Sequence, residues 1–392
     1  MDKRESKIPL IRFPEFKEGW EHKQLNELLK VSKKKNKDLK YSKEEVLSVS
    51  GELGIVNQIE HLGRSYAGAS VHNYGVVENG DIVYTKSPLK ENPYGIIKLN
   101  KGVPGIVSTL YAVYNVKENE ADGEFIEHYF SLDANTNRYL RPLVRKGAKN
   151  DMKINNEYVL HDRIFVPKKE EQKRIAHFFN VIDTKINKLK EKHNLLEDYK
   201  KGIIQKIFTQ EIRFKKEDGR DFADWQVKKL SDIAVKKSSS ISANTITDCV
   251  GSYNIYGASG LFQTVDFFEE KEDYIAIVKD GAGVGNNFLC EPYSSVLGTL
   301  EILKPKNNQT NLFFLFGLLS RVNFKKYITG STIPHIYFKD YSKEKIQIPE
   351  LEEQNKIADF LSNLDNKIEN VSSQIEDLKV YKKALLQQMF CY

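Results

Sequence analysis

The residues most suggestive of chemistry form a glycine-rich run in the second half of the chain. Residues 280–285 have the sequence DGAGVG and follow an apolar segment that is predicted to be a strand. Loops of this type bind the phosphates of a dinucleotide, or S-adenosylmethionine, when a helix begins directly behind them. Residues 286–292, NNFLCEP, do not have the sequence of a helix. We therefore expect a tight turn here and no bound cofactor.

A second motif, at residues 91–95, is similar to the Asn-Pro-Pro-Tyr box of adenine methyltransferases. Its sequence, ENPYG, lacks the second proline, and no cofactor loop accompanies it, so an ordinary loop is the better interpretation. The eight histidines are scattered, and the three cysteines, Cys249, Cys290 and Cys391, lie far apart in the sequence. No spacing of these residues suggests a metal site. The sequence thus predicts no catalytic residues, no metal and no cofactor bound by this chain.

The charge of the chain favours nucleic acid only weakly. The formal net charge is +6 and the pI about 8.8, a small excess for 392 residues. Lysines crowd residues 30–43 and 228–237, but a lone lysine run is more often a solvated loop. No apolar run approaches the ~18 residues of a membrane span, and the N-terminus leads into no apolar signal segment. Because the cysteines form no disulfide framework, we expect a cytoplasmic protein.

The elements that must position any functional residues come from an internal duplication. Residues 167–208 match residues 349–390 at a constant offset of 182 without a gap, and about 16 of the 42 positions are identical. Identical stretches include Glu170-Glu171-Gln172 with Glu352-Glu353-Gln354, and Tyr199-Lys200-Lys201 with Tyr381-Lys382-Lys383. Identity at a constant offset over this length indicates a duplicated segment.

Both copies carry apolar residues at alternating steps of four and three, the pattern of a coiled-coil seam. Neither copy has an internal proline, and each follows a proline, where a helix begins readily. A helix of about 40 residues is about 60 Å long at 1.5 Å per residue, and its apolar seam needs a partner. We expect the two copies to pair antiparallel. The seam positions are Ile175, Phe179, Ile182, Ile186, Leu189, His193, Leu196, Lys200, Ile203 and Ile207, and Ile357, Leu361, Leu364, Ile368, Val371, Ile375, Leu378, Lys382, Leu385 and Met389.

The segments that precede the two helices share their beginnings and then diverge. Residues 11–13 and 212–214 are both Ile-Arg-Phe, and each leads to one of the only two tryptophans, Trp20 and Trp225. Short apolar segments between glycine and asparagine turns predict mixed α/β modules with many short strands. The predicted strands are residues 46–49, 81–84, 111–114, 274–278 and 299–303, and the predicted short helices lie near 125–132 and 312–319.

The predicted fold class is α/β (α+β), with two mixed modules separated by two long antiparallel coiled-coil helices in a pseudo-two-fold repeat. We place the first module at residues 1–166, the first helix at 167–210, the second module at 211–348 and the second helix at 349–392. Since each helix follows its own module, antiparallel pairing would hold the modules at opposite ends of a rod.

This layout resembles the specificity subunits of type I restriction–modification systems. The resemblance covers essentially the whole chain: two variable modules, each followed by a heptad helix that opens with Pro-x-x-Glu-Glu-Gln-x-x-Ile-Ala. It extends to residues 330–334 (GSTIP), ahead of the second helix, and to residues 253–257 (YNIYG) in the second module. Each motif alone is weak, whereas the layout and the repeated helix opening together are specific.

The resemblance implies that each module is a target recognition domain that reads one half of a bipartite sequence in double-stranded DNA. The helices would fix the distance between the half-sites. They would also present surfaces to two methyltransferase subunits, which bind S-adenosylmethionine and methylate adenine after flipping it out of the duplex. Lys200 and Lys382, at the same seam position, would mark equivalent surfaces for these partners. Restriction subunits, which use ATP and magnesium, would join the complex, and this chain itself would catalyse nothing.

Residue type and loop context then select candidate DNA contacts. The glycine-bearing polar loops at residues 145–150 and 329–335 suit phosphate and base-edge contacts, although turn chemistry explains either loop equally well. In the first module the candidates are Lys86 and Ser87 and, for phosphates, Arg145, Lys146 and Lys149. In the second module they are Tyr256, Lys279, Asn286, Asn287, Ser331, Thr332 and His335.

Other functions stay open on the sequence alone. A stand-alone tandem-domain DNA-binding regulator or scaffold would have the same modular layout, but it should bind its site tightly without partners. A methyltransferase or a nuclease would be active as the purified chain. A coiled-coil surface adhesin would also have long helices, but such a protein needs a signal peptide, and the N-terminus has no signal-peptide pattern.

Overall fold

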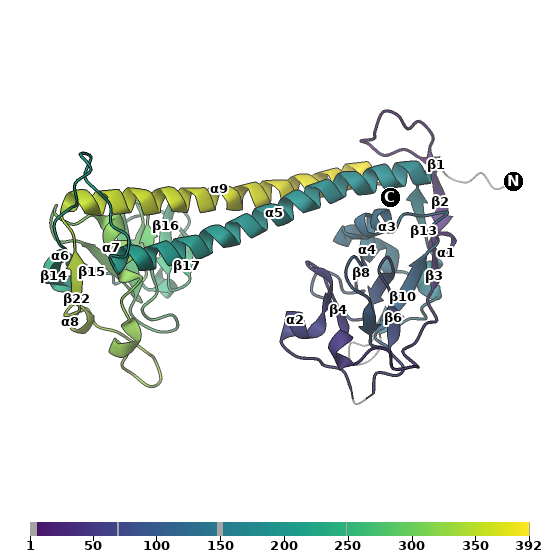
Figure 1. Cartoon of the computed structure of the whole chain (residues 1–392), viewed down its shortest axis with the longest axis horizontal. Coiled ribbons are helices and arrows are strands. Elements are labelled where there is room, and N and C mark those ends of the chain that lie inside the picture. Colours follow the sequence, from purple (N-terminus) through teal and green to yellow (C-terminus); the bar gives the residue numbers. More distant parts are fainter. Residues whose placement is uncertain (1–5, 69, 147–151, 248, 392) are drawn as a thin grey trace. The chain divides into compact units, whose positions relative to one another are not determined.

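A computed structural model describes residues 6–68, 70–146, 152–247 and 249–391, apart from the side chains of Lys146 and Lys153. The chain forms two compact units (Figure 1). Unit 1 comprises Met1–Lys190 and Ser373–Tyr392, and unit 2 comprises Glu191–Ser372. Each unit therefore combines one module with part of each long helix.

Unit 1 is organised around a four-stranded antiparallel sheet with the order β3-β10-β7-β8. These strands are Leu29–Val31, Tyr111–Val116, Ile82–Thr85 and Ile97–Leu99. β7 is buried along its whole length, so both faces of the sheet are covered there. Helix α3 (Gly123–Phe130) packs against β8.

A second sheet in unit 1, β1-β2-β13, joins the N-terminal segment to the strand that leads into the first long helix. Its strands are β1 (Ser6–Lys7), β2 (Trp20–Gln24) and β13 (Arg163–Val166). Three further pairs are β4 (Leu47–Ser50) with β5 (Gly54–Asn57), β6 (Gly75–Val77) with β9 (Gly105–Val107), and β11 (Arg145–Lys146) with β12 (Met152–Lys153). The other short helices are α1 (Leu25–Leu28), α2 (Gln58–Leu62), α4 (Asp133–Leu140), η1 (Lys43–Glu45) and η3 (Tyr158–Leu160).

Unit 2 repeats this plan with a different interior. Its four-stranded antiparallel sheet has the order β15-β21-β18-β19, which again places the strands in the order first, fourth, second, third along the chain. These strands are Ala234–Ser238, Leu300–Pro305, Tyr274–Val278 and Asn287–Cys290. The other strands are β14 (Gln226–Lys229) with β22 (Lys345–Ile348), and β17 (Gly260–Val265), β16 (Tyr253–Gly257) and β20 (Ser295–Val296) in one sheet. The short helices are α6 (Leu230–Ile233), η4 (Ala243–Thr245), α7 (Leu312–Leu319), η5 (Phe324–Tyr327) and α8 (Phe338–Tyr341).

The predicted secondary structure of the modules is confirmed. The five predicted strands correspond to β4, β7, β10, β18 and β21, and the two predicted helical patches correspond to α3 and α7. Both helices begin at a polar residue that caps them, because Asp122 accepts from the backbone N–H of Phe125 and Asn311 accepts from those of Phe313 and Phe314.

The long helices α5 (Lys169–Phe208) and α9 (Leu351–Met389) lie side by side and antiparallel within each unit (Figure 1). In unit 1 the beginning of α5 contacts the end of α9, where the rings of Phe179 and Phe390 stack with their centroids 6.1 Å apart. In unit 2 the end of α5 contacts the beginning of α9, and Ile207 shares a buried core with Ile357. The predicted antiparallel seam is thus confirmed.

The two seam lysines have internal partners. Lys382 Nζ lies 2.5 Å from Asp183 Oδ1 in unit 1, and Lys200 forms the equivalent ion pair with Asp365 in unit 2. Both lysines are half-buried and hold the two helices together. The sequence suggested them as surfaces for partner proteins, but their ammonium groups are engaged inside the chain.

The repeated Glu-Glu-Gln sequence fastens each module to its helix. Glu171 is buried and accepts a hydrogen bond from the indole N–H of Trp20 at 3.2 Å. It also accepts two bonds from the guanidinium of Arg12, both at 2.7 Å. Unit 2 has the same arrangement of Glu353 with Trp225 and Arg213. These charge-assisted bonds satisfy a carboxylate that would be costly to bury alone.

The glutamine of the same motif sets the position of the short helix in each module. Gln172 accepts from the backbone N–H of Asp122 at 2.9 Å, and Gln354 accepts from that of Asn311 at 3.0 Å. Because Asp122 and Asn311 are the capping residues of α3 and α7, each short helix begins at a fixed place beside its long helix.

Candidate nucleic-acid interface

Two loops that carry six of the twelve predicted DNA contacts meet in unit 2. Gly281 donates its backbone N–H to the carbonyl of Pro334 at 2.8 Å, and Ile336 donates to the carbonyl of Lys279 at 2.9 Å. The second loop is itself closed, because Thr329 and His335 exchange two backbone hydrogen bonds, each of 2.9 Å. The structure therefore brings residues 279–287 and 329–336 together, although they are about 50 positions apart in the sequence.

Glycines allow this approach. Gly330 has φ of +88°, and a Cβ at this position would lie 2.4 Å from the carbonyl oxygen of Ile333. Gly281, Gly283 and Gly285 also have positive φ values. The segment after them is strand β19, which pairs antiparallel with β18. The prediction of a tight turn without a following helix is thus confirmed for residues 280–285.

The side chains on this pair of loops are polar and accessible. Asn286, Ser331 and Thr332 are exposed, and Asn287 and His335 are half-buried. Lys279 is half-buried and its ammonium forms an ion pair with the carboxylate of its neighbour Asp280. A phosphate that bound Lys279 would have to compete with Asp280, a partner that the sequence reasoning did not weigh.

Tyr256 reaches the same region from strand β16. Its ring centroid lies 5.9 Å from that of Phe288, the residue that follows Asn287 in strand β19. Burial raises the pKa of Tyr256 above its ordinary value, so the phenol keeps its proton and can donate a hydrogen bond. All seven candidates of the second module thus lie on connected strands and loops.

Two further residues extend this surface and were missed from the sequence. The ring of Tyr337, which is 47% exposed, lies edge-on to the imidazole of His335, with the centroids 5.0 Å apart. Lys339 Nζ lies 5.2 Å from the centre of the Tyr337 ring. An aromatic ring beside a cation suits a nucleotide. The signal in the sequence was the Tyr-x-Lys spacing directly after the glycine loop.

The candidates of the first module come from two separate segments of unit 1. Lys86 and Ser87 are half-buried and directly follow strand β7, where Lys86 donates its backbone N–H to the carbonyl of Leu110. Arg145 is exposed on strand β11, and the backbone of Lys146 pairs with Met152. Lys149 and the side chain of Lys146 lie outside the described residues. No described element joins the two segments as the loops of unit 2 are joined.

The second motif noted in the sequence is confirmed as an ordinary loop. Asn92 is buried and donates to the carboxylate of Asp133 at 2.7 Å, and Gly95, with φ of +92°, brings the loop close to Thr85. These contacts are structural and leave Asn92 engaged inside unit 1.

Cys290 and Cys391 are both buried free thiols. Burial raises the pKa of Cys290 to about 12 and that of Cys391 to about 11, so neither thiol is ionised at neutral pH. Among the residues that the structure describes, no three His, Cys, Asp or Glu side chains are grouped so as to hold a metal ion. Within those same residues, no helix has the length and apolar character needed to span a membrane.

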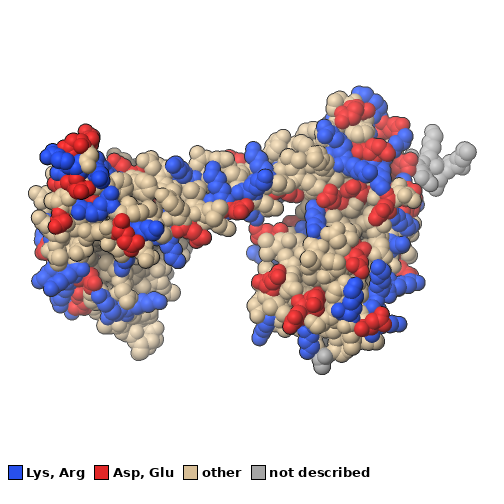
Figure 2. Space-filling view, in the orientation of Figure 1, with Lys and Arg blue, Asp and Glu red and all other residues tan. Residues whose placement is uncertain are grey.

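Charge is distributed without a single basic face in the view of Figure 2. Lysine and arginine side chains are interspersed with aspartate and glutamate over both units. Any electrostatic attraction to DNA on this face must therefore come from local clusters. The mild net charge of +6 is consistent with this distribution.

Comparisons with known proteins agree on one family. A family model for the type I restriction modification DNA specificity domain matches residues 17–198 and 223–380. The putative type I restriction enzyme MjaX specificity subunit of Methanocaldococcus jannaschii is 26% identical over an alignment 406 residues long, and the alignment covers 95% of this chain and 93% of that protein. The MjaVIII specificity subunit of the same organism is 28% identical over 260 residues, 57% of this chain and 60% of that protein.

A solved structure has a similar fold over nearly the whole chain. The crystal structure of a type I restriction–modification S subunit from M. genitalium matches with a TM-score of 0.64 at 17% sequence identity. The match covers 98% of this chain and 99% of that chain. At this identity the likeness concerns the fold, which is the two-module arrangement with long helices.

Proposed function

The chain belongs to the family of type I restriction–modification DNA specificity proteins, and we propose that its two modules read the two halves of one bipartite sequence in double-stranded DNA. The modules would be residues 1–166 and 211–348, and the repeated helices would set the gap between the half-sites. The two modules differ in sequence but are attached to their helices by the same contacts. This suits the task, because the two half-sites can differ in sequence while the helices keep the distance between them constant.

The observation that carries this proposal is the meeting of residues 279–287 with 329–336 in unit 2. Backbone hydrogen bonds hold the two loops together, so the polar side chains of both loops belong to one region of the surface. Amide groups of Asn286 and Asn287 offer the donor and acceptor pair that suits adenine, and the hydroxyls of Ser331 and Thr332 suit bases or phosphates. Lys339 adds an exposed cation beside the ring of Tyr337.

We also propose that two methyltransferase subunits bind the chain, one at each unit, and that restriction subunits can join them. S-adenosylmethionine would be bound by the methyltransferase subunits, and ATP with magnesium by the restriction subunits. This chain would contribute recognition and no catalytic step. The duplicated construction of the two units supports a partner that binds twice in the same way.

Selection from a pool of random duplexes tests this function against a stand-alone regulator. The purified chain alone and the chain with its methyltransferase subunit are each incubated with the pool, and the bound DNA is sequenced. We expect the complex to enrich two short blocks separated by a gap of fixed length, with little enrichment by the chain alone. Strong enrichment of one continuous block by the chain alone would instead support the regulator.

A further inference from the structure

The identical positions of the two repeated helices fall into two groups. Most are used inside the chain, as Glu171, Gln172 and Asp183 are. A smaller group is exposed and includes Lys201 with Lys383 and Gln205 with Gln387. Among the described residues, no carboxylate lies within ion-pair distance of Lys201 or Lys383. Within the described part of the chain, these four side chains form no hydrogen bond or ion pair, and their identity in both copies points to a ligand that binds each unit in the same way.

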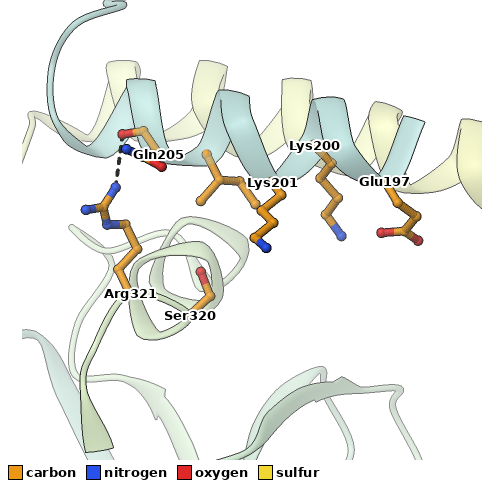
Figure 3. Close-up of a pocket in the computed structure, with 7 residues that line it drawn as sticks. Glu197, Lys200, Lys201, Gln205, Ser320 and Arg321 are labelled. Carbon is orange, nitrogen blue, oxygen red and sulfur yellow. Dashed lines mark hydrogen bonds between the residues drawn. The ribbon is translucent and has the colours of Figure 1, made fainter. Parts of the chain in front are cut away.

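In unit 2 these residues line a pocket of about 470 Å³ (Figure 3). Lys201 and Gln205 are one turn apart on α5 and therefore share a face of the helix. The opposite wall is the end of α7, where Arg321 donates to the backbone carbonyl of Gln205 at 3.0 Å. Ile204 adds an aliphatic surface, and Glu197 is the one acidic side chain of the lining.

Unit 1 has a pocket at the equivalent place, with a volume of about 710 Å³. Its α9 residues are those found in unit 2 at the offset of 182, and they are Lys379, Lys382, Lys383, Leu386 and Gln387. The opposite wall includes Ser131, which follows α3 as Ser320 follows α7. Because equivalent residues line both walls of the two pockets, we infer that the two pockets have the same function.

The linings of both pockets are cationic. Three basic side chains and one acidic side chain line the pocket of unit 2, and six basic and three acidic side chains line that of unit 1. In unit 1, Lys98 lies half-buried at the pocket, and its burial lowers its pKa. A half-buried ammonium with no ion-pair partner among the described residues gains from an anion placed against it.

We propose that Lys201 with Gln205, and Lys383 with Gln387, form two equivalent anion-binding sites, each of which takes an acidic side chain of the methyltransferase subunit that docks on that unit. This inference rests on the proposed function, since it requires one kind of partner bound twice. The lysine would pair with the carboxylate, and the glutamine amide would bond a second carboxylate oxygen or a neighbouring backbone group.

A protein carboxylate fits these pockets better than the phosphates of DNA. Duplex DNA presents a dense row of charges, which would meet more of the acidic side chains in these cationic linings, such as Glu197 and Asp133, than a single carboxylate would. An aspartate or glutamate brings one charge on a short aliphatic stem. That stem matches Ile204 in unit 2 and Leu386 in unit 1.

The helical residues of the two sites differ in charge at one position, where Glu197 in unit 2 corresponds to Lys379 in unit 1. With more basic side chains around it, the unit 1 site should hold its acidic group more tightly and with a steeper dependence on salt. The first methyltransferase copy is therefore expected at unit 1.

Charge reversal with a count of bound subunits tests the inference. Lys201→Glu, Lys383→Glu and the double variant are each mixed with the methyltransferase subunit, and the stoichiometry is followed by native mass spectrometry over a concentration series. We expect two copies on the unaltered chain, at least about tenfold weaker binding of one copy in each single variant, and weak binding of both in the double variant. Lys383→Glu should have the larger effect.

Two matched variants serve as controls. Lys383→Arg keeps the charge and should keep both copies bound. Lys192→Glu reverses an exposed lysine on α5 that lies outside both pockets and corresponds to Gln374 in the other copy, so it should also bind two copies. Circular dichroism of every variant checks that the helices are intact.

The possible outcomes distinguish the proposed function from the inference about the two sites. An unaltered chain that binds no methyltransferase subunit would overturn the proposed function together with this inference. If the unaltered chain binds two copies and the double variant binds them equally well, the inference alone is overturned. Normal assembly combined with a salt dependence of DNA binding that is lower by about two ions would assign the sites to phosphates and also overturn it.

Discussion

The buried carboxylate of Glu171 accepts a hydrogen bond from the indole N–H of Trp20, with 3.2 Å between Oε1 and Nε1. This bond joins the first turn of α5 to strand β2 of the module. The hydrogen bond from Arg12 to the same carboxylate raises the pKa of that guanidinium above its ordinary value. Trp225 and Glu353 make the same contact in unit 2 at 3.1 Å. Both copies of the duplicated segment thus keep the hydrogen bond between the tryptophan of the module and the glutamate of the helix, whereas the interiors of the two modules differ in sequence.

Replacing Glu171 with alanine should destabilise unit 1 by about 3–5 kcal/mol, because it leaves the nearly buried Arg12 without its partner. The measurement is denaturant unfolding followed by the fluorescence of Trp20 in a Trp225→Phe background. Glu170→Ala, at the exposed neighbouring position, should change stability by less than about 0.5 kcal/mol. If the two substitutions lowered the free energy of unfolding equally, the buried contacts of Glu171 would make no specific contribution to stability.

The seam ion pair can be tested by a charge exchange. Lys382 and Asp183 are 18% and 33% exposed, so their coupling energy should be modest, about 0.5–1 kcal/mol. Asp183→Lys and Lys382→Asp should each destabilise unit 1, and the double exchange should recover most of the loss in a double-mutant cycle. The cycle of Asp183 with the exposed Lys383 should show no coupling. Coupling to Lys383 instead would place the helices in a different register.

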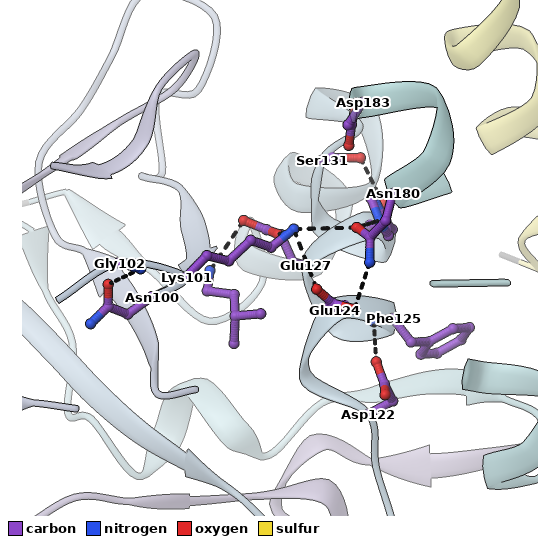
Figure 4. Close-up of polar contacts among 12 residues, drawn as sticks. Asn100, Lys101, Gly102, Asp122, Glu124, Phe125, Glu127, Ser131, Asn180 and Asp183 are labelled. Atoms are coloured by element: carbon purple, nitrogen blue, oxygen red, sulfur yellow. Dashed lines mark hydrogen bonds and ion pairs between the residues drawn. The ribbon is translucent and has the colours of Figure 1, made fainter. Parts of the chain in front are cut away.

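The stability of unit 1 should decrease at acidic pH because unit 1 contains a buried histidine. His128 in α3 donates to Asn180 Oδ1 at 3.1 Å, and Asn180 lies between Lys101 and Glu124 (Figure 4). Burial, reinforced by the charge of Lys382, lowers the pKa of His128 to about 4 from an ordinary value of 6.5. Between pH 4 and pH 6.5, His128 therefore binds a proton more readily in the unfolded chain than in the folded chain.

The sign follows from this difference in proton binding. As the pH drops from 6.5 toward 4, the free energy of unfolding of unit 1 should decrease by up to about 3 kcal/mol, and it should be insensitive to this group above pH 6.5. Unfolding curves at several pH values measure the slope. His128→Gln should remove most of it, and an unchanged slope would mean that other groups cause the acid sensitivity.

The helices and the modular plan were predictable from the sequence because their signals are periodic and local. The heptad seam and the offset of 182 are visible without knowledge of contacts. The buried strand β18 was recognisable as five consecutive apolar residues. The pairing of Lys200 with Asp365 was not predictable, because a lysine on a seam can pair across it or face a partner protein.

The candidate site was predicted only in part for a similar reason. Residue types pointed to both loops of unit 2, but their meeting depends on backbone bonds such as that between Gly281 and Pro334, which carry no side-chain signal. The ion pair of Lys279 with Asp280 was also overlooked, although the two are adjacent. In unit 1 the candidate segments are not connected by any described element, and residue type alone gives no way to choose between them.

The neighbour of Lys279 gives a direct test of the DNA surface. Asp280→Asn would release the ammonium of Lys279 and remove a negative charge, so the complex should bind DNA more tightly and with a salt dependence steeper by about one ion. Lys279→Ala should have the opposite effect on all sequences alike. The readout is the affinity for duplex DNA as a function of salt concentration. If neither substitution changes the slope, these two residues are not part of the interface.

The central claim is that one chain reads two half-sites across a fixed gap. Mapping of modified bases in a genome that expresses the chain with its methyltransferase subunit tests it most directly. The account predicts N6-methyladenine within a bipartite motif whose two short blocks are always separated by the same number of unspecified base pairs. Methylation at a single continuous motif without a gap would contradict it.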